Sequence, residues 1–260
     1  MRLSLNSLAR FSGLVQTGLH FRDKFEDAKR SVQPRDFDWY PYDCFANLFY
    51  LQRVMQGAGL SLEQMIGHGP VLDIGAADGA LSFFLESLGY AVECWDYSGA
   101  NINRMNGLRS LARVLGSRVQ ICDVDLDGRF EITRRYGTAL FLGTLYHLKN
   151  PFYALETLAK HAQFCFLSTR VARLSANRKV RVDDIPVAYL LDGEECNSDA
   201  TNYWIFSPTG LTLLAKRTGW RICASATSGA TESDPQSQAG DERMFLLLQS
   251  TQISAGPEAP

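Results

Sequence analysis

The chain lacks the basic excess that is typical of nucleic-acid-binding proteins and the cysteine spacing that is typical of zinc and redox sites. Its 26 lysine and arginine residues are outnumbered by 28 aspartate and glutamate residues, which gives a net charge of -2. A protein dedicated to nucleic acid usually carries a basic excess, so a nucleic-acid partner is not favoured. None of the six cysteines has C-x-x-C spacing, so neither a zinc site nor a redox site is indicated.

Membrane and export signals are also missing from the sequence. No window approaches the length of a membrane-spanning helix, and Arg10 interrupts the apolar stretch where a signal peptide would need an unbroken core. We therefore expect a soluble, cytoplasmic protein with reduced and mostly buried cysteines. Composition leaves the oligomeric state open.

Apolar periodicity divides the chain into a helical segment and an α/β segment. Apolar residues recur at helical spacing between residues 1 and 68, and Pro41 predicts an extended or turn segment between two helices. From Pro70 short apolar strands alternate with helices, which predicts a Rossmann-like, mostly parallel sheet covered by helices on both faces. The predicted strands are 71–74, 91–95, 118–122, 138–143 and 163–169, and the predicted helices are 80–88, 100–115 and 152–161.

The regular alternation stops after Arg170. Residues 171–207 are predicted to form an irregular insert over the site, because long connections in compact domains are usually functional. A helix beginning at Ser207 or Pro208 and two strands, 220–226 and 244–249, complete the pattern. The sequence thus predicts a seven-stranded sheet with a C-terminal antiparallel hairpin. The predicted parts are an N-terminal helical cover over 1–68, a main domain over 69–252 and a disordered tail over 253–260.

A glycine loop joins the first predicted strand to the helix that follows it. The run VLDIGAADG, residues 71–79, places Asp73 two residues ahead of Gly75 and ends at Gly79. Glycines let a backbone pass close to a ligand at the carboxyl edge of a parallel sheet. The spacing differs from the G-x-G-x-x-G of dinucleotide-binding loops, and the acid would repel a pyrophosphate. A cofactor with a cationic amino group therefore suits this loop better than a nicotinamide dinucleotide.

Two further acids follow the next two strands. Asp96 closes the second strand, where a carboxylate can accept both hydroxyls of a ribose, and Asp123 closes the third, where a carboxylate can accept an adenine amino group. A single acid at a strand end is more often a helix N-cap or a solvated turn residue. Three acids at the ends of successive strands point instead to a cofactor that carries adenosine.

The loop DIGAADG, residues 73–79, resembles the motif of class I S-adenosylmethionine-dependent methyltransferases, in which an acid precedes alternating glycines. The sequence departs from that motif at the middle glycine, which is Ala77. The resemblance covers residues 70–170. It implies contacts to the methionine part from Asp73 and Gly75, to the ribose from Asp96, and to the adenine from Asp123 and Val124. The candidate cofactor residues are Asp73, Gly75, Ala76, Asp78, Gly79, Asp96, Tyr97, Asp123, Val124, Leu142 and Gly143.

Two later segments resemble a narrower group of these enzymes. The stretch FLGTLYHLKNP, residues 141–151, looks like the segment after the fourth strand in the enzymes that carboxymethylate wobble uridine in tRNA. The stretch NYWIFSP, residues 202–208, resembles another part of those enzymes, whereas the terminal portions look less alike. The resemblance therefore implies a shared subfamily more than a shared substrate.

Methyl transfer from a sulfonium mainly needs positioned reactants and a dry site, and it needs a base only when the acceptor must lose a proton early. His147 is the candidate base, because it follows the fourth strand at the cofactor edge and an imidazole titrates in the useful range. The alternative is a structural role in that loop. Tyr146 either orients the acceptor or faces the core.

Aromatic residues crowd two segments that are expected to cover the site. Rings can stabilise a sulfonium and wall off a planar acceptor, but packing of the N-terminal helices on the sheet also explains each single ring. The candidate acceptor-binding residues are Trp39, Tyr40, Tyr42, Tyr203 and Trp204, with Phe206 beside them.

These observations favour a methyltransferase that transfers a methyl group from S-adenosylmethionine to a small-molecule acceptor, a biosynthetic intermediate. One alternative is tRNA wobble-uridine modification with S-adenosylmethionine or its carboxylated form, which needs a cationic group near the sulfonium and a basic surface. Another is a non-catalytic S-adenosylmethionine-binding subunit, which would keep the three acids but lack a closed acceptor pocket.

Overall fold

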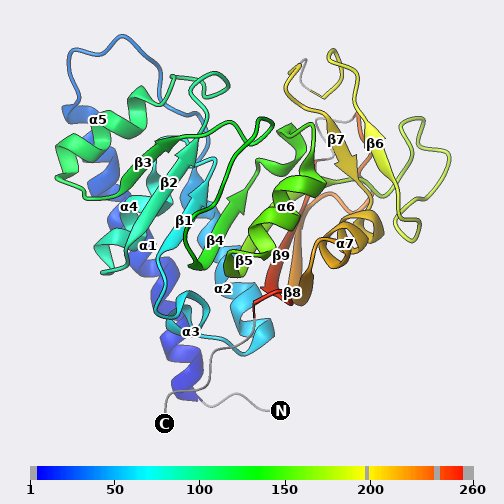
Figure 1. Ribbon diagram of the computed structural model, residues 1–260, viewed down its shortest axis with the longest axis horizontal. Helices are drawn as coiled ribbons and strands as arrows, with labels where there is room; N and C mark the ends of the chain where they lie inside the picture. The colour runs from blue at the N-terminus through cyan, green and yellow to red at the C-terminus, as the bar shows by residue number, and fades with distance from the viewer. Residues whose placement is uncertain (1–4, 197–198, 237–240, 254–260) are drawn as a thin grey trace.

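The computed structural model of the protein describes residues 5–196, 199–236 and 241–253, with side chains from residue 13 onward. Its helices are α1 (Leu5–Ser31), α2 (Asn47–Ala58), α3 (Leu62–Ile66), α4 (Ala80–Ser87), α5 (Asn106–Leu115), α6 (Pro151–Ala159) and α7 (Pro208–Arg217), with short 3-10 helices η1 (Cys44–Ala46) and η2 (Leu145–His147). Its strands are β1 (Val71–Ile74), β2 (Val92–Asp96), β3 (Gln120–Asp123), β4 (Tyr136–Leu142), β5 (Ala162–Val171), β6 (Ala188–Leu190), β7 (Trp204–Phe206), β8 (Trp220–Gly229) and β9 (Glu242–Ser250). Figure 1 shows the helices arranged on both faces of one twisted sheet.

A single sheet forms the centre of the fold. Its strands run in the order β3-β2-β1-β4-β5-β7-β6, and β9 pairs with both β5 and β8. Strands β1 to β5 are parallel to one another, whereas β9 runs antiparallel to β5 and to β8. The mostly parallel, Rossmann-like sheet and the C-terminal hairpin predicted from the sequence are confirmed.

The predicted number of strands is wrong, because the described residues form a sheet of nine strands and not seven. The two additional strands, β6 and β7, lie within residues 171–207, the segment predicted to be irregular. β7 joins the sheet through the pair Val171↔Phe206 and carries β6 as an antiparallel neighbour. Each of the two contains three residues, too few for an alternating pattern to be recognised in the sequence.

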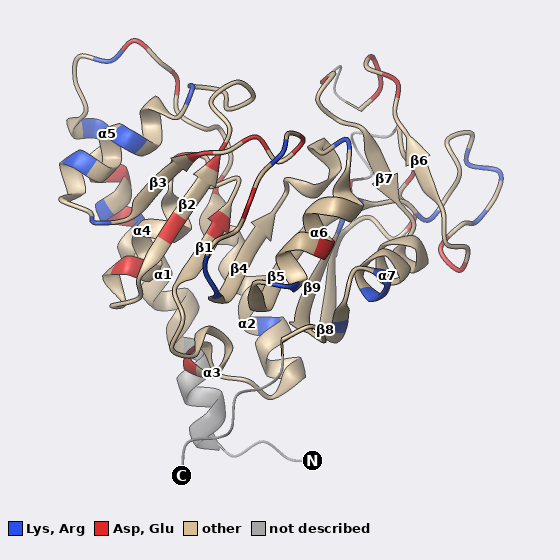
Figure 2. Cartoon of the chain, in the orientation of Figure 1, with Lys and Arg blue, Asp and Glu red and all other residues tan. Residues whose placement is uncertain are grey.

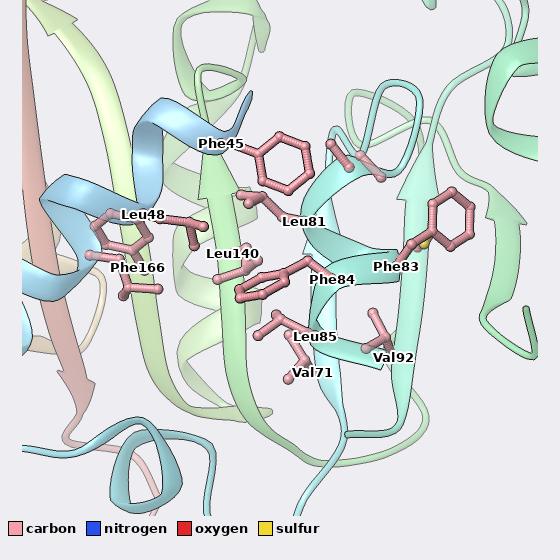
Figure 3. Packing of buried hydrophobic residues seen from close by; sticks show 14 of the residues in the cluster. Phe45, Leu48, Val71, Leu81, Phe83, Phe84, Leu85, Val92, Leu140 and Phe166 are labelled. Carbon is pink, nitrogen blue, oxygen red and sulfur yellow. The ribbon is translucent and has the colours of Figure 1, made fainter. Parts of the chain in front are cut away.

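Successive residues of the central strands point into two hydrophobic layers, one on each face of the sheet. Leu140 of β4 packs with residues of α1, α2 and α4, whereas the next residue, Phe141, packs with residues of α6 and α7. Figure 3 shows the ring of Phe84 beside Leu140 in the first of these layers. Phe84 has no exposed surface, and full burial of such a side chain contributes roughly 1.5–3 kcal/mol.

The N-terminal helices pack directly on the first face of the sheet. Phe25 of α1 is 2% exposed, and its ring centroid lies 5.7 Å from that of Phe45 and 6.4 Å from that of Phe83. Tyr50 of α2 stacks on Phe245 of β9 with ring centroids 4.0 Å apart. The helices predicted within 1–68 are confirmed where the structure describes them, and their separation as a cover domain stays a prediction.

Helix α5 begins at Asn106 rather than at Ala100, where the sequence predicted its start. The side-chain oxygen of Asn101 accepts hydrogen bonds from the backbone N–H groups of Asn103 and Met105. Met105 has a left-handed backbone with φ of 64°. Side-chain bonds to nearby backbone groups compete with helix formation, so residues 101–105 form a turn.

The described residues bear on two expectations about membranes and termini. Within them, no helix is both long and apolar enough to cross a membrane. The predicted disordered tail, 253–260, lies outside the described residues except for Ile253.

The packing of α1 predicts that the N-terminal helices unfold together with the sheet. Phe25→Ala should lower the free energy of unfolding by about 3–5 kcal/mol, because it opens a cavity among buried rings. Leu19→Ala on the same helix removes a side chain that is 41% exposed and should change it by about 0.5 kcal/mol or less. Urea denaturation followed by tryptophan fluorescence and by circular dichroism measures both. Two transitions, with only one shifted by Phe25→Ala, would show that the cover is a separate domain.

Candidate active site

The carboxyl ends of β1, β2 and β3 bring three acids to one edge of the sheet. Asp73 is the residue before the last of β1, and Asp96 and Asp123 end β2 and β3, where they are paired in register. Figure 2 shows acidic residues at this upper edge of the sheet and in the loops beside it. The structure therefore brings together the three carboxylates singled out in the sequence.

The loop 75–79 turns sharply between β1 and α4. Gly75, Ala77 and Gly79 have positive φ angles of 70°, 53° and 82°. A Cβ on Gly75 would lie 2.1 Å from Thr144 Oγ1, so glycine is required where the loop touches the segment after β4. Ala77 holds a left-handed conformation at the position of the motif's middle glycine, which costs about 1–2 kcal/mol. Its N–H donates to Asp96 Oδ2 at 2.8 Å, which helps to fix that conformation.

The Asp96 carboxylate accepts three hydrogen bonds from the protein. Oδ2 accepts from Ala77 N–H at 2.8 Å and from Asn101 Nδ2 at 3.1 Å, and Oδ1 accepts from Tyr97 N–H at 2.8 Å. Burial raises the pKa of this carboxyl, and the three bonds oppose the rise. Since a carboxylate offers about four acceptor positions, one position remains for a hydroxyl donor of a ligand.

Asp73 lies beneath the loop and is 5% exposed. Burial raises the pKa of its carboxyl to about 6; a hydrogen bond donated by Ser82 Oγ opposes the rise, and the charge of Asp96 adds to it. The Asp73 carboxyl is therefore ionised above about pH 6, where it attracts a cationic group.

Asp123 and Val124 form the outer side of the edge. Asp123 Oδ1 accepts from Ser98 N–H at 2.9 Å, and its hydrogen bonds with Ser98 hold the pKa of this exposed carboxyl below its usual range. Val124 N–H donates to Asp96 O at 2.8 Å. Tyr97 is 42% exposed. This end of the edge is therefore more open to solvent than the Asp73 end.

The remaining loop residues singled out as cofactor contacts frame the same edge. Ala76 O accepts from Gly79 N–H at 2.7 Å, which closes the turn into α4. Leu142 ends β4, and Gly143 follows it with its N–H donating to Ser168 O at 3.0 Å. The glycine loop and the segment after β4 are thus adjacent, as their proposed roles require.

Asp78 is surrounded by protein partners. It is 4% exposed, its Oδ2 accepts from Tyr40 N–H at 2.7 Å, and its Oδ1 accepts from Asn103 Nδ2 at 2.8 Å. Lys29 Nζ of α1 lies 4.0 Å from Oδ2. Asp78 therefore ties α1, the segment 38–43 and the turn before α5 to the glycine loop, and its contact with a cofactor stays a prediction.

Helix η2 carries both candidate catalytic residues. His147 Nδ1 lies 3.1 Å from Thr201 O and 3.0 Å from Thr201 Oγ1. With the proton on Nδ1 donated to the carbonyl, Nε2 is left as an acceptor. Burial lowers the pKa of this imidazole, which favours the neutral form that a general base needs. The ring of Tyr146 lies 4.2 Å from that of His147.

Tyr40 of the N-terminal segment lies close enough to η2 to interact with Tyr146. Burial raises the pKa of its hydroxyl, and Tyr146 and Arg243 are close enough for their charges to act on it. The ring of Tyr42 lies 5.4 Å from that of Tyr40, but Tyr42 is 69% exposed. Both rings line a pocket beside the glycine loop, and their role in acceptor binding stays a prediction.

The three other candidate acceptor-binding rings are those of Tyr203, Trp39 and Trp204, and their contacts differ. Tyr203 N–H donates to Tyr146 O at 2.8 Å, which holds the insert against η2. Trp39 packs edge-on against Phe37, with ring centroids 5.0 Å apart. Trp204 packs on the hydrophobic layer of α6 and α7. The contacts of Trp39 and Trp204 are thus with the protein, and their role in acceptor binding stays a prediction.

A pocket of about 350 Å³ opens beside the glycine loop, and its lining includes Lys29, Cys44 and Asp78. Burial raises the pKa of the Cys44 thiol, and the charges of Asp73 and Asp78 raise it further. This pocket therefore adjoins the acidic end of the edge. A second pocket of about 430 Å³ lies between residues 31–37 and α5.

Sequence reasoning missed three residues that shape the site: Lys29, Asn103 and Arg243. Lys29 and Asn103 reach Asp78 from distant segments, and no local pattern announces such contacts. Arg243 had a visible signal, because a charged residue directly before the apolar run of a strand usually has a partner or a functional role.

Comparison with known proteins identifies the fold. Residues 42–150 match the family model described as tellurite resistance protein TehB. No curated protein is similar enough in sequence to match the chain. The N-terminal domain of EvdMO1 with SAH bound is similar in structure, with a TM-score of 0.56 and 16% identity, over 88% of this chain and 96% of that one.

Two further solved structures extend the comparison. The PH0226 protein from Pyrococcus horikoshii OT3 has a TM-score of 0.51 and 18% identity, over 79% of this chain and 90% of that one. A putative methyltransferase from Bacillus halodurans C-125 has a TM-score of 0.56 and 12% identity, over 76% of this chain and 97% of that one. At these identities the likeness concerns the fold, and the chain has the Rossmann-like α/β fold that these proteins share.

Proposed function

We propose that the protein is an S-adenosylmethionine-dependent methyltransferase that acts on a small-molecule acceptor, a biosynthetic intermediate, in the cytoplasm. The observation that carries this proposal is the placement of Asp73, Asp96 and Asp123 around a glycine loop at one edge of a Rossmann-like sheet. The match of residues 42–150 to TehB, a family of S-adenosylmethionine-dependent methyltransferases, supports the activity. The SAH bound by the EvdMO1 domain supports the cofactor.

The residues at the edge fit this cofactor in charge and in hydrogen-bonding capacity. Asp73, ionised above about pH 6, would attract the amino group of the methionine part. Asp96 has one acceptor position left for a ribose hydroxyl, and Asp123 with Val124 would border the adenine at the open end. When bound, S-adenosylmethionine supplies a methyl group already activated by its sulfonium.

The protein's own residues then hold, orient and desolvate the acceptor. Tyr40 and Tyr146 stand where they can exclude water, and positioning of this kind supplies much of the rate of a displacement. His147 Nε2 would accept the proton that the acceptor loses, while Thr201 holds Nδ1.

One observation favours tRNA wobble-uridine modification as a second candidate function. Use of a carboxylated donor needs a cationic group near the sulfonium, and Arg243 Nη2 lies 3.4 Å from Tyr146 Oη. The net charge of -2 argues against a tRNA substrate, because phosphate contacts provide most of the affinity for nucleic acid. We therefore place this function second.

Calorimetric titration with S-adenosylmethionine, its carboxylated form and NAD tests the cofactor. We expect tight binding of S-adenosylmethionine and none of NAD. Asp96→Asn should weaken S-adenosylmethionine binding by about 1.5–3 kcal/mol, because a charged acceptor is lost. Asp27→Asn, a matched change of a carboxylate whose side chain is 72% exposed on α1, should leave the affinity unchanged. Binding of NAD alone, or equal affinity in Asp96→Asn, would contradict the proposal.

The ionised Asp73 carboxyl should lower the stability of the folded protein and strengthen its binding of the cofactor. Because its folded pKa of about 6 lies above the ordinary value of 3.8, the folded state binds more protons than the unfolded state between these values. The contribution of Asp73 to stability therefore falls as the pH rises from about 4 to 6. We compare the free energy of unfolding of Asp73→Asn with that of the wild type at each pH. This difference should be more favourable to the variant at pH 7.5 than at pH 4, by up to about 3 kcal/mol. The same change should weaken S-adenosylmethionine binding, and urea denaturation at both pH values with calorimetry checks the pair. The buried-charge account would be refuted if Asp73→Asn, compared with the wild type at each pH, changed the free energy of unfolding no more favourably at pH 7.5 than at pH 4.

The role of His147 is tested by turnover and its pH dependence once an acceptor has been found by screening. If His147 is the base, kcat should fall as the pH drops through its lowered pKa, below the ordinary value of 6.5. His147→Gln should lower kcat about 100-fold or more, remove that acid limb and leave cofactor affinity nearly unchanged. His161→Gln, a matched change of a histidine held by Thr157 O at the end of α6, should have no effect. A fully active His147→Gln would rule out the base role, and cofactor binding without transfer to any acceptor would favour a non-catalytic subunit.

A further inference from the structure

Two arginines of neighbouring strands share one carboxylate at the β5 side of the site. Arg170 of β5 and Arg243 of β9 are paired in register, so both side chains leave the same face of the sheet. Arg170 Nε lies 2.6 Å from Asp241 Oδ1, and Arg243 Nε lies 3.5 Å from Asp241 Oδ2. Arg170 thus holds Asp241 at the shorter distance and also donates to Cys196 Sγ, whereas Arg243 lies farther from the same carboxylate.

A neighbouring arginine shows the contrast. Nε and Nη2 of Arg173 donate to the Glu242 carboxylate at 2.7–2.9 Å, and its Nη1 lies 3.7 Å from Asp183 Oδ2. Glu242 is 1% exposed and also accepts from Ser233 Oγ at 2.8 Å. This carboxylate is therefore occupied and does not neutralise Arg243.

Arg243 retains hydrogen-bond donors that its neighbours do not use. Its polar partners among the described residues are Asp241 at 3.5 Å and Tyr146 Oη at 3.4 Å, both long for charged hydrogen bonds. A guanidinium has five N–H donors, so most of its capacity remains. The side chain is 36% exposed, which lets a ligand from solvent reach it.

Arg243 lies on the side of the site where the acceptor is expected, away from the acids that are expected to hold the cofactor. Its Nη1 lies 3.4 Å from the place that a Cβ would occupy on Gly143, so the lack of a side chain there makes room for the guanidinium. Tyr146, the partner of Arg243, is in ring contact with the candidate base His147 at 4.2 Å. The acids Asp73, Asp96 and Asp123 lie at the ends of β1 to β3, on the other half of the same edge.

We propose that Arg243, together with the hydroxyl of Tyr146, binds a carboxylate carried by the methyl acceptor. The planar fork of a guanidinium matches the two oxygens of a carboxylate and fixes its orientation, which a point charge does not. The acceptor class is thus a small carboxylic acid, held by its anionic end so that another atom meets the methyl group. This inference rests on the proposed function.

The experiment uses benzoate as the probe and benzamide as its neutral isostere. The 260-residue protein is first titrated with S-adenosylhomocysteine by calorimetry, and the loaded protein is then titrated with each probe. Benzoate should bind saturably and benzamide should not. Arg243→Gln should weaken benzoate binding at least about tenfold and Arg243→Lys should weaken it less, because a lysine keeps the charge but not the fork. Arg221→Gln, an exposed arginine of β8, is the matched control and should bind benzoate as the wild type does.

Failure of the proposed function and failure of the carboxylate subsite give different titration results. No binding of S-adenosylhomocysteine overturns the proposed function before any probe is added. Normal binding of S-adenosylhomocysteine with no saturable binding of benzoate, or with equal binding in Arg243→Gln, overturns the carboxylate subsite. If Arg243→Gln instead weakens only the carboxylated donor, the anion belongs to the donor and the acceptor inference is wrong. Thermal melts monitor folding, and Arg243→Lys decides the matter if Arg243→Gln does not fold.

Discussion

The site depends on one buried carboxylate whose partners come from distant parts of the chain. Asp78 lies in the glycine loop and holds the backbone of Tyr40, the side chain of Asn103 and, at longer range, Lys29. A buried charge is tolerated only where such partners replace water, so these segments stay together or the charge is exposed. By fixing Tyr40, the same contacts place its hydroxyl near Tyr146. The N-terminal helices thus belong to the site as well as to the core.

Local patterns in the sequence were sufficient for the part of the site that is local in space. The strand, loop and helix from Val71 to Ser87 are contiguous, and parallel pairing of β1, β2 and β3 follows from the alternation of strands and helices. Those two facts together place Asp73, Asp96 and Asp123 at one edge. The candidate base, His147, was found because it follows β4, the next strand in that sheet.

The features that escaped prediction depend on contacts between distant residues. Strand β7 is held by burial of Ile205 and Phe206, and β6 is held by its antiparallel pairing with β7, so neither shows a pattern of its own. The start of α5 was displaced by the side chain of Asn101, which bonds to the backbone ahead of it. Arg243 follows β4 by about a hundred residues, and only the pairing of β9 with β5 brings it beside Tyr146.

Acidic side chains lie at one half of the edge of the sheet, and arginines paired with acids lie at the other half. Carboxylates end β1 to β3, and arginines lie in β5 and β9. Under the proposed function, the acids attract a cationic cofactor to one half and Arg243 attracts an anionic acceptor to the other, so charge helps to orient both ligands.

Strand β5 pairs with both β9 and β7, but the two pairings differ greatly in length. β9 pairs with β5 from Phe164 to Val171, whereas β7 is in register with it at Val171 alone. Insertions or deletions in the segment that carries β6 and β7 therefore leave the registers of β1 to β5 and of β9 undisturbed. Under the proposed function, in which this segment faces the acceptor, natural selection can change that side of the site while it leaves the opposite half of the edge as it is. A lineage of this fold can thus diversify its acceptors without inventing its donor site again.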